Sequence, residues 1–450
     1  MAEIKKILIA NRGEIVQRAI RTIREMGKKS VAVYSAGDKN ASYLKHADEA
    51  VCIGGAKSSE SYLNIPAIIT AAEMTGCDAI FPGYGFLSEN QDFVEICRLH
   101  NIKFIGPSVE VMEKMADKSK AKEEMIRAGV PVVPGSKGAV HSVTEGKVVA
   151  AEIGYPIMAK AAAGGGGRGM RLIKEESEFD QLFMAASSEA LAAFGDGTMY
   201  LERFINNPRH IEVQVVGDSH GNAIHIGERD CSLQRRHQKV IEESPAILLN
   251  DETRAKLHDV AVKATKYLKY EGAGTFEFLA DDKQNIYFME MNTRLQVEHP
   301  VSEMVSGIDI VELMIKVAEG EKVPSQESIK FKGHAIECRI TAEDPNSFLP
   351  SPGKVTQWMV PGGRNVRVDS HVYTNYVVPP YYDSMIGKLI VWGRDRNKAI
   401  NIMKRALAEF EVEGIRTTIP FHQKMMENED FICNNYDTKY LENYKNLDEL

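Results

Sequence analysis

The amino-acid sequence predicts a protein of several domains, with a doubly wound parallel α/β sheet at its N-terminus and α+β units after it. Three features support this prediction. Short apolar runs alternate with helical periodicity over residues 1–113, a glycine-rich segment lies between two strand-like runs near residue 165, and a polar hairpin pattern occupies residues 275–300. Alternation of strand and helix is typical of a parallel sheet, whereas the later segments fit α+β units.

Length and composition place the chain among ordinary globular proteins. Its 450 residues leave room for two to four domains at the usual ~100 to 200 residues each. A net charge of −8 argues against nucleic acid as a partner. No apolar run approaches the ~18 residues of a membrane span, and the six cysteines contain no C-x-x-C pair. We therefore expect a cytoplasmic protein without signal peptide, membrane contact or disulfides, acting on small molecules.

The N-terminal segment predicts five strands, within the runs KKILIA, SVAVYS, DEAVCIG, DAIFPG and IKFIG. Its first turn, ANRGEI, lacks the G-x-G-x-x-G pattern of dinucleotide-binding domains, so we expect no cofactor there. The turn formed by residues 82–85 (PGYG) follows a strand at the carboxyl edge, where open α/β sheets bind ligands. It is either part of a site or only a tight turn.

The glycine-rich segment follows a proline-punctuated linker, VPVVPGS, which marks a domain boundary. Residues 164–169 match G-x-G-x-x-G, but a strand rather than a helix follows them, which excludes a Rossmann fingerprint. A glycine-rich hairpin loop can instead fold over phosphates with its N–H groups free, and Lys160 would add a cation. A surface loop is the alternative.

A basic cluster lies in the run ERDCSLQRRHQK, which contains Arg229, Arg235, Arg236, His237 and Lys239. In a chain of negative net charge, such a local concentration of cations favours one anionic substrate over a polyanion. An exposed basic patch is the alternative. His210 lies in the strand-like run RHIEVQV, which alternates polar and apolar residues, and a lone histidine on a strand is more often structural than catalytic.

The polar turn at residues 281–285 separates two strand-like runs and predicts a β-hairpin. If Glu277 faces Glu290, then Asn292 shares their face, and cross-strand Cβ atoms lie only ~5 Å apart. Facing carboxylates repel unless a cation joins them, and Mg²⁺ suits such hard oxygen ligands. The pattern therefore predicts a magnesium site, with a solvated strand face as the alternative.

The same spacing of two continues beyond the hairpin to Arg294, Gln296 and Glu298. If the chain stays extended, these side chains line the same face as the carboxylates. The opposite face is apolar and is expected to be buried; it comprises Phe276, Phe278, Met289 and Met291.

Six motifs together resemble a known family. The cations and carboxylates above are similar to those of ATP-grasp ligases, which hold ATP between two α+β units. The likeness is closer to the biotin carboxylase subunits of acetyl-CoA carboxylase, from about Ile4 to the C-terminal region. It is carried by FPGYGFLSEN, GGGGRGM, ERDCSLQRRHQK, EMNTRLQVEHP, HAIECRITAEDP and PPYYDSMIGKLI, in the family's order. Ala163, where some members have Gly, and Phe204, where Tyr is common, depart from the pattern; they are expected to affect lid stiffness and the shape of the adenine pocket.

The resemblance implies three domains. These are an N-terminal α/β domain at 1–113, an ATP-grasp domain at 114–330 with a mobile glycine-rich lid at about 131–204, and an α+β C-terminal domain at 331–450. It also implies a reaction: ATP phosphorylates bicarbonate to carboxyphosphate, which yields CO₂ and phosphate, and the ureido nitrogen of biotin captures the CO₂. In such chemistry the protein mainly positions phosphates and neutralises developing charge.

The resemblance also assigns residues to the nucleotide and the metal. ATP would be bound by Lys118, Lys160, His210, the amides of Gly165 and Gly166, and the adenosine-binding residues Glu202, Ile205, Gln234, His237 and Leu279. Two Mg²⁺ or Mn²⁺ ions are expected, with Glu277, Glu290 and Asn292 as ligands.

The remaining implied residues belong to bicarbonate and biotin. Arg294 offers a planar fork and Lys239 a point charge to bicarbonate, assisted by Gln296 and the backbone of Val297. Glu298 would be the base that deprotonates bicarbonate. Arg339 would stabilise the oxygen of enolised biotin, near Tyr84 and Gly85.

The expected partners follow from the same resemblance. No A-M-K-M biotin-attachment tetrapeptide occurs in the sequence, so biotin is expected on a separate carrier protein. Carboxyltransferase subunits would use the product to form malonyl-CoA for fatty acid synthesis, and a homodimer is expected. A split pyruvate or propionyl-CoA carboxylase is the alternative. A scaffold protein that has lost catalysis is disfavoured because Glu298, Arg294 and Arg339 are all present.

Overall fold

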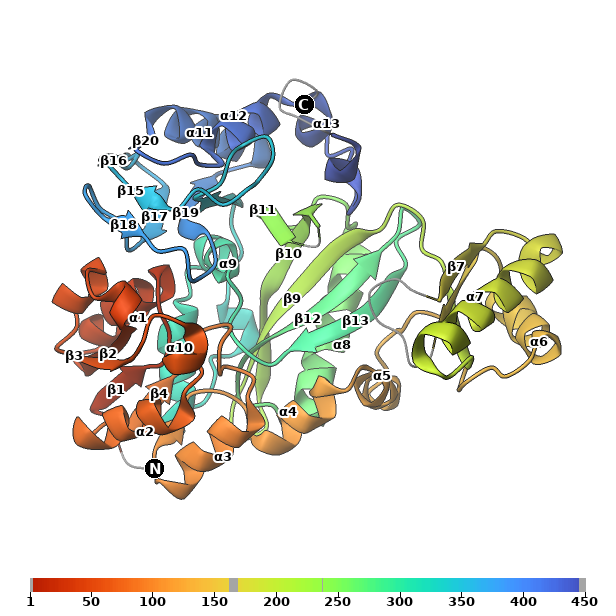
Figure 1. Cartoon of the computed structure of the whole chain (residues 1–450), viewed down its shortest axis with the longest axis horizontal. Coiled ribbons are helices and arrows are strands. Elements are labelled where there is room, and N and C mark those ends of the chain that lie inside the picture. The colour runs from red at the N-terminus through yellow and green to blue at the C-terminus, as the bar shows by residue number, and fades with distance from the viewer. Residues whose placement is uncertain (1–2, 162–168, 237, 445–450) are drawn as a thin grey trace.

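The computed structural model describes residues 3–161, 169–236 and 238–444. The N-terminal region is a five-stranded parallel sheet in the order β3-β2-β1-β4-β5, which confirms the doubly wound α/β prediction (Figure 1). Its elements are β1 (Lys6–Ile9), α1 (Glu14–Glu25), β2 (Lys29–Ser35), β3 (Glu49–Gly54), α2 (Ile65–Met74), β4 (Ala79–Phe81), α3 (Gln91–Leu99) and β5 (Lys103–Phe104).

The helices of this region begin and pack as their sequences dictate. Ile15, Ala19 and Ile23 on α1 are fully buried, because their spacing puts them on one stripe against the sheet. Asn64 and Asn90 cap α2 and α3 by accepting hydrogen bonds from main-chain N–H groups three residues ahead. The charged segment that follows forms two helices, α4 (Val109–Ala116) and α5 (Lys118–Arg127).

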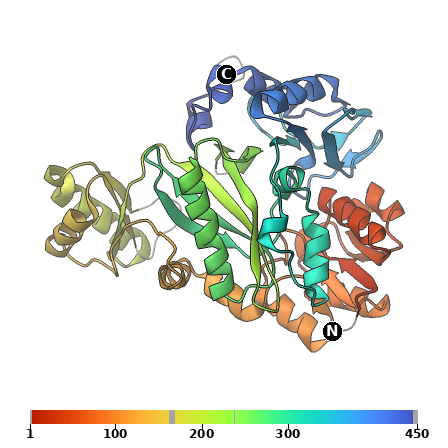
Figure 2. The same cartoon turned by 180° about the vertical axis from the view of Figure 1, so that it is seen from behind.

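The predicted lid is a small unit with its own core. A three-stranded antiparallel sheet, β7-β6-β8, packs against two helices, and Figures 1 and 2 show the unit projecting from the rest of the molecule. Its elements are α6 (Val143–Ile153), β6 (Ile157–Ala161), β7 (Met170–Ile173), α7 (Phe179–Phe194) and β8 (Met199–Arg203). The predicted phosphate-binding amides of Gly165 and Gly166, and the departure at Ala163, lie outside the described residues.

The rest of the chain is built on one eight-stranded sheet, in the order β13-β12-β9-β10-β11-β14-β19-β17. Strands from the segment after residue 330 thus continue the central sheet through backbone hydrogen bonds, while the predicted domain boundaries stay predictions. The strands are β9 (Arg209–Gly217), β10 (Ala223–Arg235), β11 (Gln238–Ser244), β12 (Gly272–Ala280), β13 (Ile286–Asn292), β14 (His334–Thr341), β17 (Val366–Ser370) and β19 (Met385–Gly393).

Helices cover this sheet on both faces. Helix α8 (Asp251–Tyr267) packs on β9 and β10, whereas α9 (His299–Ser306) packs against β10, β11, β14 and β19. The remaining elements are α10 (Ile310–Ala318), β15 (Gly353–Lys354), β16 (Gln357–Met359), β18 (Val377–Val378), α11 (Arg396–Glu409), β20 (Glu411–Glu413), α12 (Ile419–Glu427) and α13 (Glu429–Ile432).

The hairpin of β12 and β13 pairs as predicted at its centre and differs at two points. Glu277 is the direct partner of Glu290, and the Asn292 amide donates to Glu277 at 2.7 Å. A bulge then pairs Phe278 with Phe288, so the intervening Met289 points outward and is 40% exposed. The prediction that Met289 shares the buried face is therefore wrong.

The prediction that the chain stays extended beyond the hairpin is also wrong. The strand ends at Asn292, the chain turns, and Glu298 becomes the residue that precedes α9. Pro300 in the first turn of α9 favours this start, since its missing N–H would have no helical partner there. All six cysteines are free thiols, and no helix in the described part of the chain is long and apolar enough to cross a bilayer.

Candidate active site

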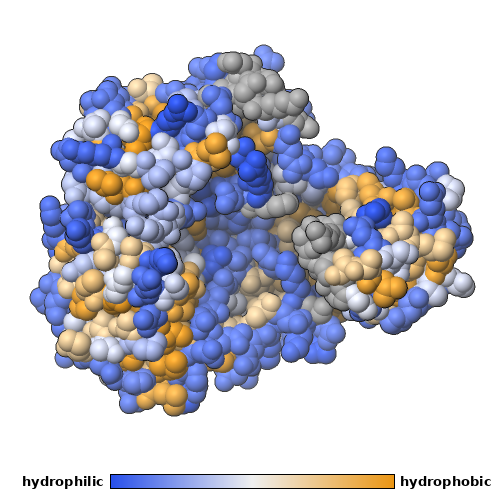
Figure 3. All heavy atoms as spheres, viewed as in Figure 1, coloured by the Kyte–Doolittle hydropathy of each residue, from blue (hydrophilic) through white to orange (hydrophobic). Residues whose placement is uncertain are grey.

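A cavity of about 850 Å³ lies where the N-terminal sheet, the central sheet and the strands after residue 330 meet. Figure 3 shows the molecule hollowed between the lid and the remainder, with hydrophilic side chains over the hollow. Among the residues that line the cavity are the predicted site residues Tyr84, Gly85, Lys239, Arg294, Gln296, Val297, Glu298 and Arg339.

The turn after β4 brings the N-terminal region to the cavity. The Asn11 amide donates to the main-chain oxygens of Pro82 and Tyr84, at 2.7 and 2.8 Å, and fixes the turn. Gly83 has φ +64°, and a Cβ there would lie 3.0 Å from that amide. The Tyr84 hydroxyl donates to Glu14, so its phenol points into the protein while the turn borders the cavity.

Lys239 is the centre of what we call the lysine–carboxylate cluster, formed with Glu212, Glu277 and Glu298. Its ammonium donates to Glu212, to Glu277 at 3.0 Å and to Glu298 at 2.7 Å. Burial alone would lower the pKa of Lys239, but the three carboxylates outweigh it and raise that pKa well above the usual value. The same contacts hold the pKa values of Glu277 and Glu298 below their usual range against burial. The cluster is therefore charged at neutral pH.

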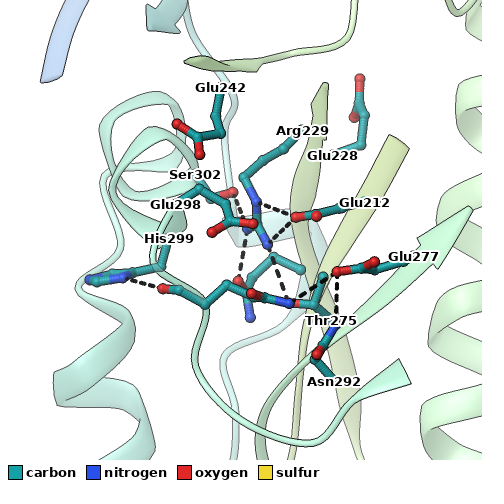
Figure 4. Close-up of polar contacts among 12 residues, drawn as sticks. Glu212, Glu228, Arg229, Glu242, Thr275, Glu277, Asn292, Glu298, His299 and Ser302 are labelled. Atoms are coloured by element: carbon teal, nitrogen blue, oxygen red, sulfur yellow. Dashed lines mark hydrogen bonds and ion pairs between the residues drawn. The ribbon is translucent and has the colours of Figure 1, made fainter. Parts of the chain in front are cut away.

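Arg229, predicted as part of a substrate-binding basic cluster, has a different place. It is fully buried behind Glu212, to which its Nε and Nη2 donate at 3.2 and 3.1 Å (Figure 4). It also donates to Gln214 at 2.8 Å and to Ser302 of α9 at 3.0 Å. Arg229 thus supports the cluster through Glu212 and does not line the cavity. Among the residues of the ERDCSLQRRHQK run that the structure describes, the basic side chains that line the cavity are Arg235, Arg236 and Lys239.

His210 lies beside the cluster on β9. Its Nε2 is 3.2 Å from Glu212 and 3.0 Å from Glu277, and the Gln234 amide is 2.8 Å from its Nδ1. Burial alone would lower the pKa of His210, but the two carboxylates outweigh it and raise it to about 9. The ring is therefore a cation at neutral pH, which a phosphate oxygen could approach.

Glu298 is held between two cations. One oxygen accepts from Lys239 and the other from Arg339 Nη2 at 3.0 Å. Arg339 also donates from Nε to Glu242 at 2.5 Å, and Glu298 is fully buried. A carboxylate fixed in this way can accept a proton at a defined position, which is the first requirement of a general base.

Arg294 also lines the cavity. Its Nε donates to Glu89 at 2.8 Å, and its terminal nitrogens donate to Asn292 and Gln296 at 3.1 and 3.2 Å. Gln296 in turn donates to Glu277 at 3.2 Å. Although the chain is not extended here, the turn still directs Arg294, Gln296 and Glu298 to one cavity.

The residues predicted to bind metal offer a matching set of hard ligands. Glu277 and Glu290 are cross-strand partners, and Asn292 contacts Glu277. Both carboxylates already attract cations, since Lys239 contacts Glu277 and the Lys118 ammonium lies 3.4 Å from Glu290. Lys118 is 85% exposed and hence weakly held. The donor set therefore fits Mg²⁺ or Mn²⁺.

The described residues predicted to bind nucleotide come from the lid, from α5 and from the central sheet. Glu202 on β8 accepts from Lys160 at 2.6 Å and from Lys122 at 3.2 Å. Ile205 is almost buried at the hinge and Leu279 is half-buried on β12. His237 lies outside the described residues. In this structure the predicted phosphate-binding Lys160 is thus paired with a predicted adenosine ligand.

Sequence reasoning missed three carboxylates that the structure brings to the site: Glu89, Glu212 and Glu242. Glu212 could have been found from the sequence, because it lies two residues after His210 and shares its face of the strand. The structure shows that it is the direct partner of Glu277 in the sheet. Glu89 lies in the FLSEN motif but contacts Arg294 across 205 residues of sequence. No local signal predicts that long-range contact, or the one between Glu242 and Arg339.

Taken together, the cavity offers a base between two cations and an arginine fork. The neighbouring β12–β13 hairpin offers a carboxylate pair of the kind that binds metal. Models of known families match residues 3–112 (biotin carboxylase, N-terminal domain), 117–326 (carbamoyl-phosphate synthase L chain, ATP binding domain) and 337–443 (biotin carboxylase C-terminal domain).

Individual relatives match over nearly the whole chain. A biotin carboxylase of Nostoc sp. is 56% identical over 97% of this chain and 98% of its own. A biotin carboxylase–β,γ-ATP complex from Campylobacter jejuni is 68% identical, with a TM-score of 0.89 over 98% of this chain and 99% of that one. The biotin carboxylase domain dimer of Hydrogenobacter thermophilus 2-oxoglutarate carboxylase, with MgADP, ADP and bicarbonate, is 49% identical, with a TM-score of 0.86 over 98% of both chains. With three family models in order and relatives this similar along its length, the chain belongs to the biotin carboxylase family.

Proposed function

We propose that the protein carboxylates biotin on a separate carrier protein, using ATP and bicarbonate through carboxyphosphate. The observation that carries the proposal is the fixed position of Glu298 between Lys239 and Arg339 in the wall of the cavity. This arrangement combines a proton acceptor, a cation for an attacking anion and a cation for a developing oxyanion. The relatives described as biotin carboxylases support the choice of substrate.

The first step is attack by a bicarbonate oxygen on the terminal phosphorus of ATP, which forms carboxyphosphate and ADP. Arg294 and Lys239 would bind bicarbonate, and Gln296 with the Val297 backbone would orient it. Glu298 would take the bicarbonate proton, because both of its oxygens are fixed and its lowered pKa keeps it ionised. The low pKa gives a weak base, so the approach of the substrate anion must supply part of the driving force.

The residues at the nucleotide end of the site would position ATP and neutralise the charge of its phosphates. His210, Lys118 and Lys160 would hold phosphate oxygens, together with the amides of Gly165 and Gly166, while Glu202, Ile205, Gln234, His237 and Leu279 would surround the adenosine. Bound Mg²⁺ or Mn²⁺, two ions in our proposal, would neutralise phosphate charge and act as a Lewis acid. Glu277, Glu290 and Asn292 would hold the metal, which requires Lys239 and Lys118 to release those carboxylates.

The second step joins CO₂ to biotin. Carboxyphosphate breaks into CO₂ and phosphate, the phosphate takes the proton from the ureido nitrogen, and that nitrogen then bonds to the carbon of CO₂. Arg339 would stabilise the negative ureido oxygen, with the Tyr84–Gly85 turn beside it. Since biotin would arrive on a carrier, the mouth of the same cavity must admit a long side chain.

The proposed pathway is acetyl-CoA carboxylation with partner carboxyltransferase subunits, in a cytoplasmic homodimer. A different acceptor, as in a split pyruvate or propionyl-CoA carboxylase, is a second candidate. Of these acceptors, the keto acid pyruvate is favoured by the 49% identity to a domain of a 2-oxoglutarate carboxylase, which is named for a keto acid rather than an acyl-CoA. Reconstitution with the biotinylated carrier and carboxyltransferase encoded in the same organism, offering acetyl-CoA, propionyl-CoA or pyruvate, distinguishes these acceptors.

The direct test is ATP hydrolysis with bicarbonate, measured with and without free biotin. We expect hydrolysis to require bicarbonate and to accelerate with biotin. Lys239→Ala and Arg294→Ala should abolish the biotin-dependent rate while the protein stays folded, and Lys147→Ala on the lid surface is a matched control. Bicarbonate-independent hydrolysis, or full activity of both cavity variants, would contradict the proposal.

A further inference from the structure

Two buried carboxyl groups behind Arg339 have no part in the steps above. Glu242 on β11 and Glu337 on β14 are direct partners in the antiparallel ladder, and both are fully buried. Side chains of such partners start only ~5 Å apart. The two carboxyl groups therefore share one small space in the protein interior, under helix α9.

Most of the hydrogen-bonding capacity of this pair is unused. Glu242 Oε1 accepts from Arg339 Nε at 2.5 Å, whereas Glu242 Oε2 and both oxygens of Glu337 have no partner among the described residues. A buried polar group without a partner destabilises the folded protein, and an unpaired buried charge does so more strongly. One proton held between the carboxyl groups gives each a partner and removes the repulsion of like charges.

The surrounding charges are already engaged. The charged and titratable groups around the pair are Arg339, Lys388, Glu298, Tyr84 and Lys239. Glu14 contacts Lys388, and His299 begins the helix that packs on β11 and β14. Lys388 donates to the Val297 oxygen at 2.8 Å and lies 3.1 Å from Glu14. Burial holds the pKa of His299 well below its usual value, so this ring is neutral. Hence the described residues offer Glu337 no free cation.

Two different edges of the Arg339 guanidinium contact two different carboxylates. Glu242 holds Nε and Glu298 holds Nη2, which leaves Nη1 without a partner in the part of the chain that the structure describes. If Glu242 lost its charge, the arginine fork would favour a bidentate pair with Glu298. The Arg339 guanidinium would then cover Glu298, the proposed base. Its Nη1 could no longer donate a hydrogen bond to an incoming ligand.

We propose that Glu242 and Glu337 form a one-proton acid pair that positions Arg339 for the biotin step. Glu337 keeps the proton, and the charged Glu242 holds the Nε edge of Arg339 away from Glu298. Both are positioning residues, since neither lines the cavity. This inference rests on the proposed function and adds to it the control of Arg339 by a buried group.

The pH dependence follows from the same geometry. Burial raises the pKa of Glu337 well above its usual value, and burial together with the neighbouring carboxylates raises that of Glu242 to about 7. Below pH 7 Glu242 becomes neutral and releases its edge of Arg339. We therefore expect kcat/KM for biotin to fall as the pH drops through about 7.

The test compares Glu242→Gln with Glu337→Gln. Glu242→Gln should lower kcat/KM for free biotin about ten- to a hundred-fold, with KM for ATP unchanged. It should also abolish the acid limb of the pH profile, which is the fall of kcat/KM for biotin below about pH 7. Glu337→Gln should keep activity and the acid limb, because Gln has the shape of a neutral carboxyl group and can donate to Glu242. An acid limb that persists in Glu242→Gln, or a Glu337→Gln variant as impaired as Glu242→Gln, would overturn the proposal.

An infrared measurement tests the proton itself. At pH 8 the wild-type protein should show a protonated-carboxyl C=O stretch that is missing from Glu337→Gln, and identical spectra would refute the one-proton pair. This readout needs no turnover and no folded Glu242 variant. If wild-type protein shows the infrared band but no bicarbonate-dependent ATP hydrolysis, the proposed function fails while the acid pair stands.

Discussion

The two ends of the proposed site differ in how their charges are held. At the bicarbonate end, Glu298, Glu212 and Arg229 are fully buried and paired with one another or with Lys239. At the nucleotide end, Lys160 and Glu290 are each 42% exposed, and Lys118 is 85% exposed. The first end is preorganised by the fold, whereas the second consists of more exposed ions that lie on three separate elements, α5, β6 and β13. We therefore expect the bicarbonate end to be fixed before substrates bind and the nucleotide end to be ordered by ATP.

The largest effect that would test this contrast is expected at Glu298. Glu298→Gln keeps the shape but takes no proton, and loss of a general base typically lowers kcat by ~10² to 10⁴. KM for ATP should change little, because the nucleotide end is untouched. Steady-state kinetics measure both. If Gln preserves kcat while the melting temperature falls, Glu298 serves only to hold Lys239 and Arg339.

A substitution at Arg229 tests whether the buried ion pairs at the bicarbonate end stabilise the fold. Arg229→Met leaves Glu212 without its arginine, and breaking a buried pair in this way typically costs ~3 to 5 kcal/mol of unfolding free energy. Urea denaturation provides the measurement. The matched control is Arg236→Met, an exposed cation of the same sequence cluster, which should stay within ~0.5 kcal/mol of wild type. Equal stability of the two variants would remove the contrast.

Glu228 is a buried charge whose ion pairs lie outside the cavity. It therefore tests whether a buried ion pair can stabilise the fold without affecting catalysis. Burial alone would raise its pKa, but His258 and Arg254 outweigh it and lower it from 4.5 to about 2. A lowered pKa adds stability that is present above pH 4.5 and lost as the pH falls through about 2.

Glu228→Gln should therefore lose ~3 kcal/mol at pH 7, and the gap to wild type should narrow towards pH 2. Denaturation curves at several pH values measure this gap, and kcat should be unchanged. A loss of kcat without a loss of stability would show that this buried charge also serves the reaction.

The smallest effect is expected at the nucleotide end. Lys160→Ala should raise KM for ATP about 10- to 100-fold, the worth of one charged hydrogen bond. Stability should change by less than ~1 kcal/mol, since the pair with Glu202 is half-exposed. Lys147→Ala, which removes a surface pair on the same unit, should alter neither value. A destabilised Lys160→Ala variant would show that this end is preorganised too.

The sequence by itself determined the local features of this protein. Alternating apolar runs predicted the parallel N-terminal sheet, and the turn at 281–285 predicted the hairpin that pairs Glu277 with Glu290. These predictions succeed because strand periodicity and turn chemistry act over a few residues. The six motifs identified the family, since long matches in order are specific where one glycine pattern is not.

Only the tertiary structure decided which side chains meet. It placed Arg229 beneath the site rather than in it, exposed Met289 through a bulge, and ended the strand before Arg294. It also brought Glu89 to Arg294 and Glu242 to both Arg339 and Glu337. The physical reason is that a buried charge is stable only beside a partner, and the fold supplies that partner from strands and loops far apart in sequence.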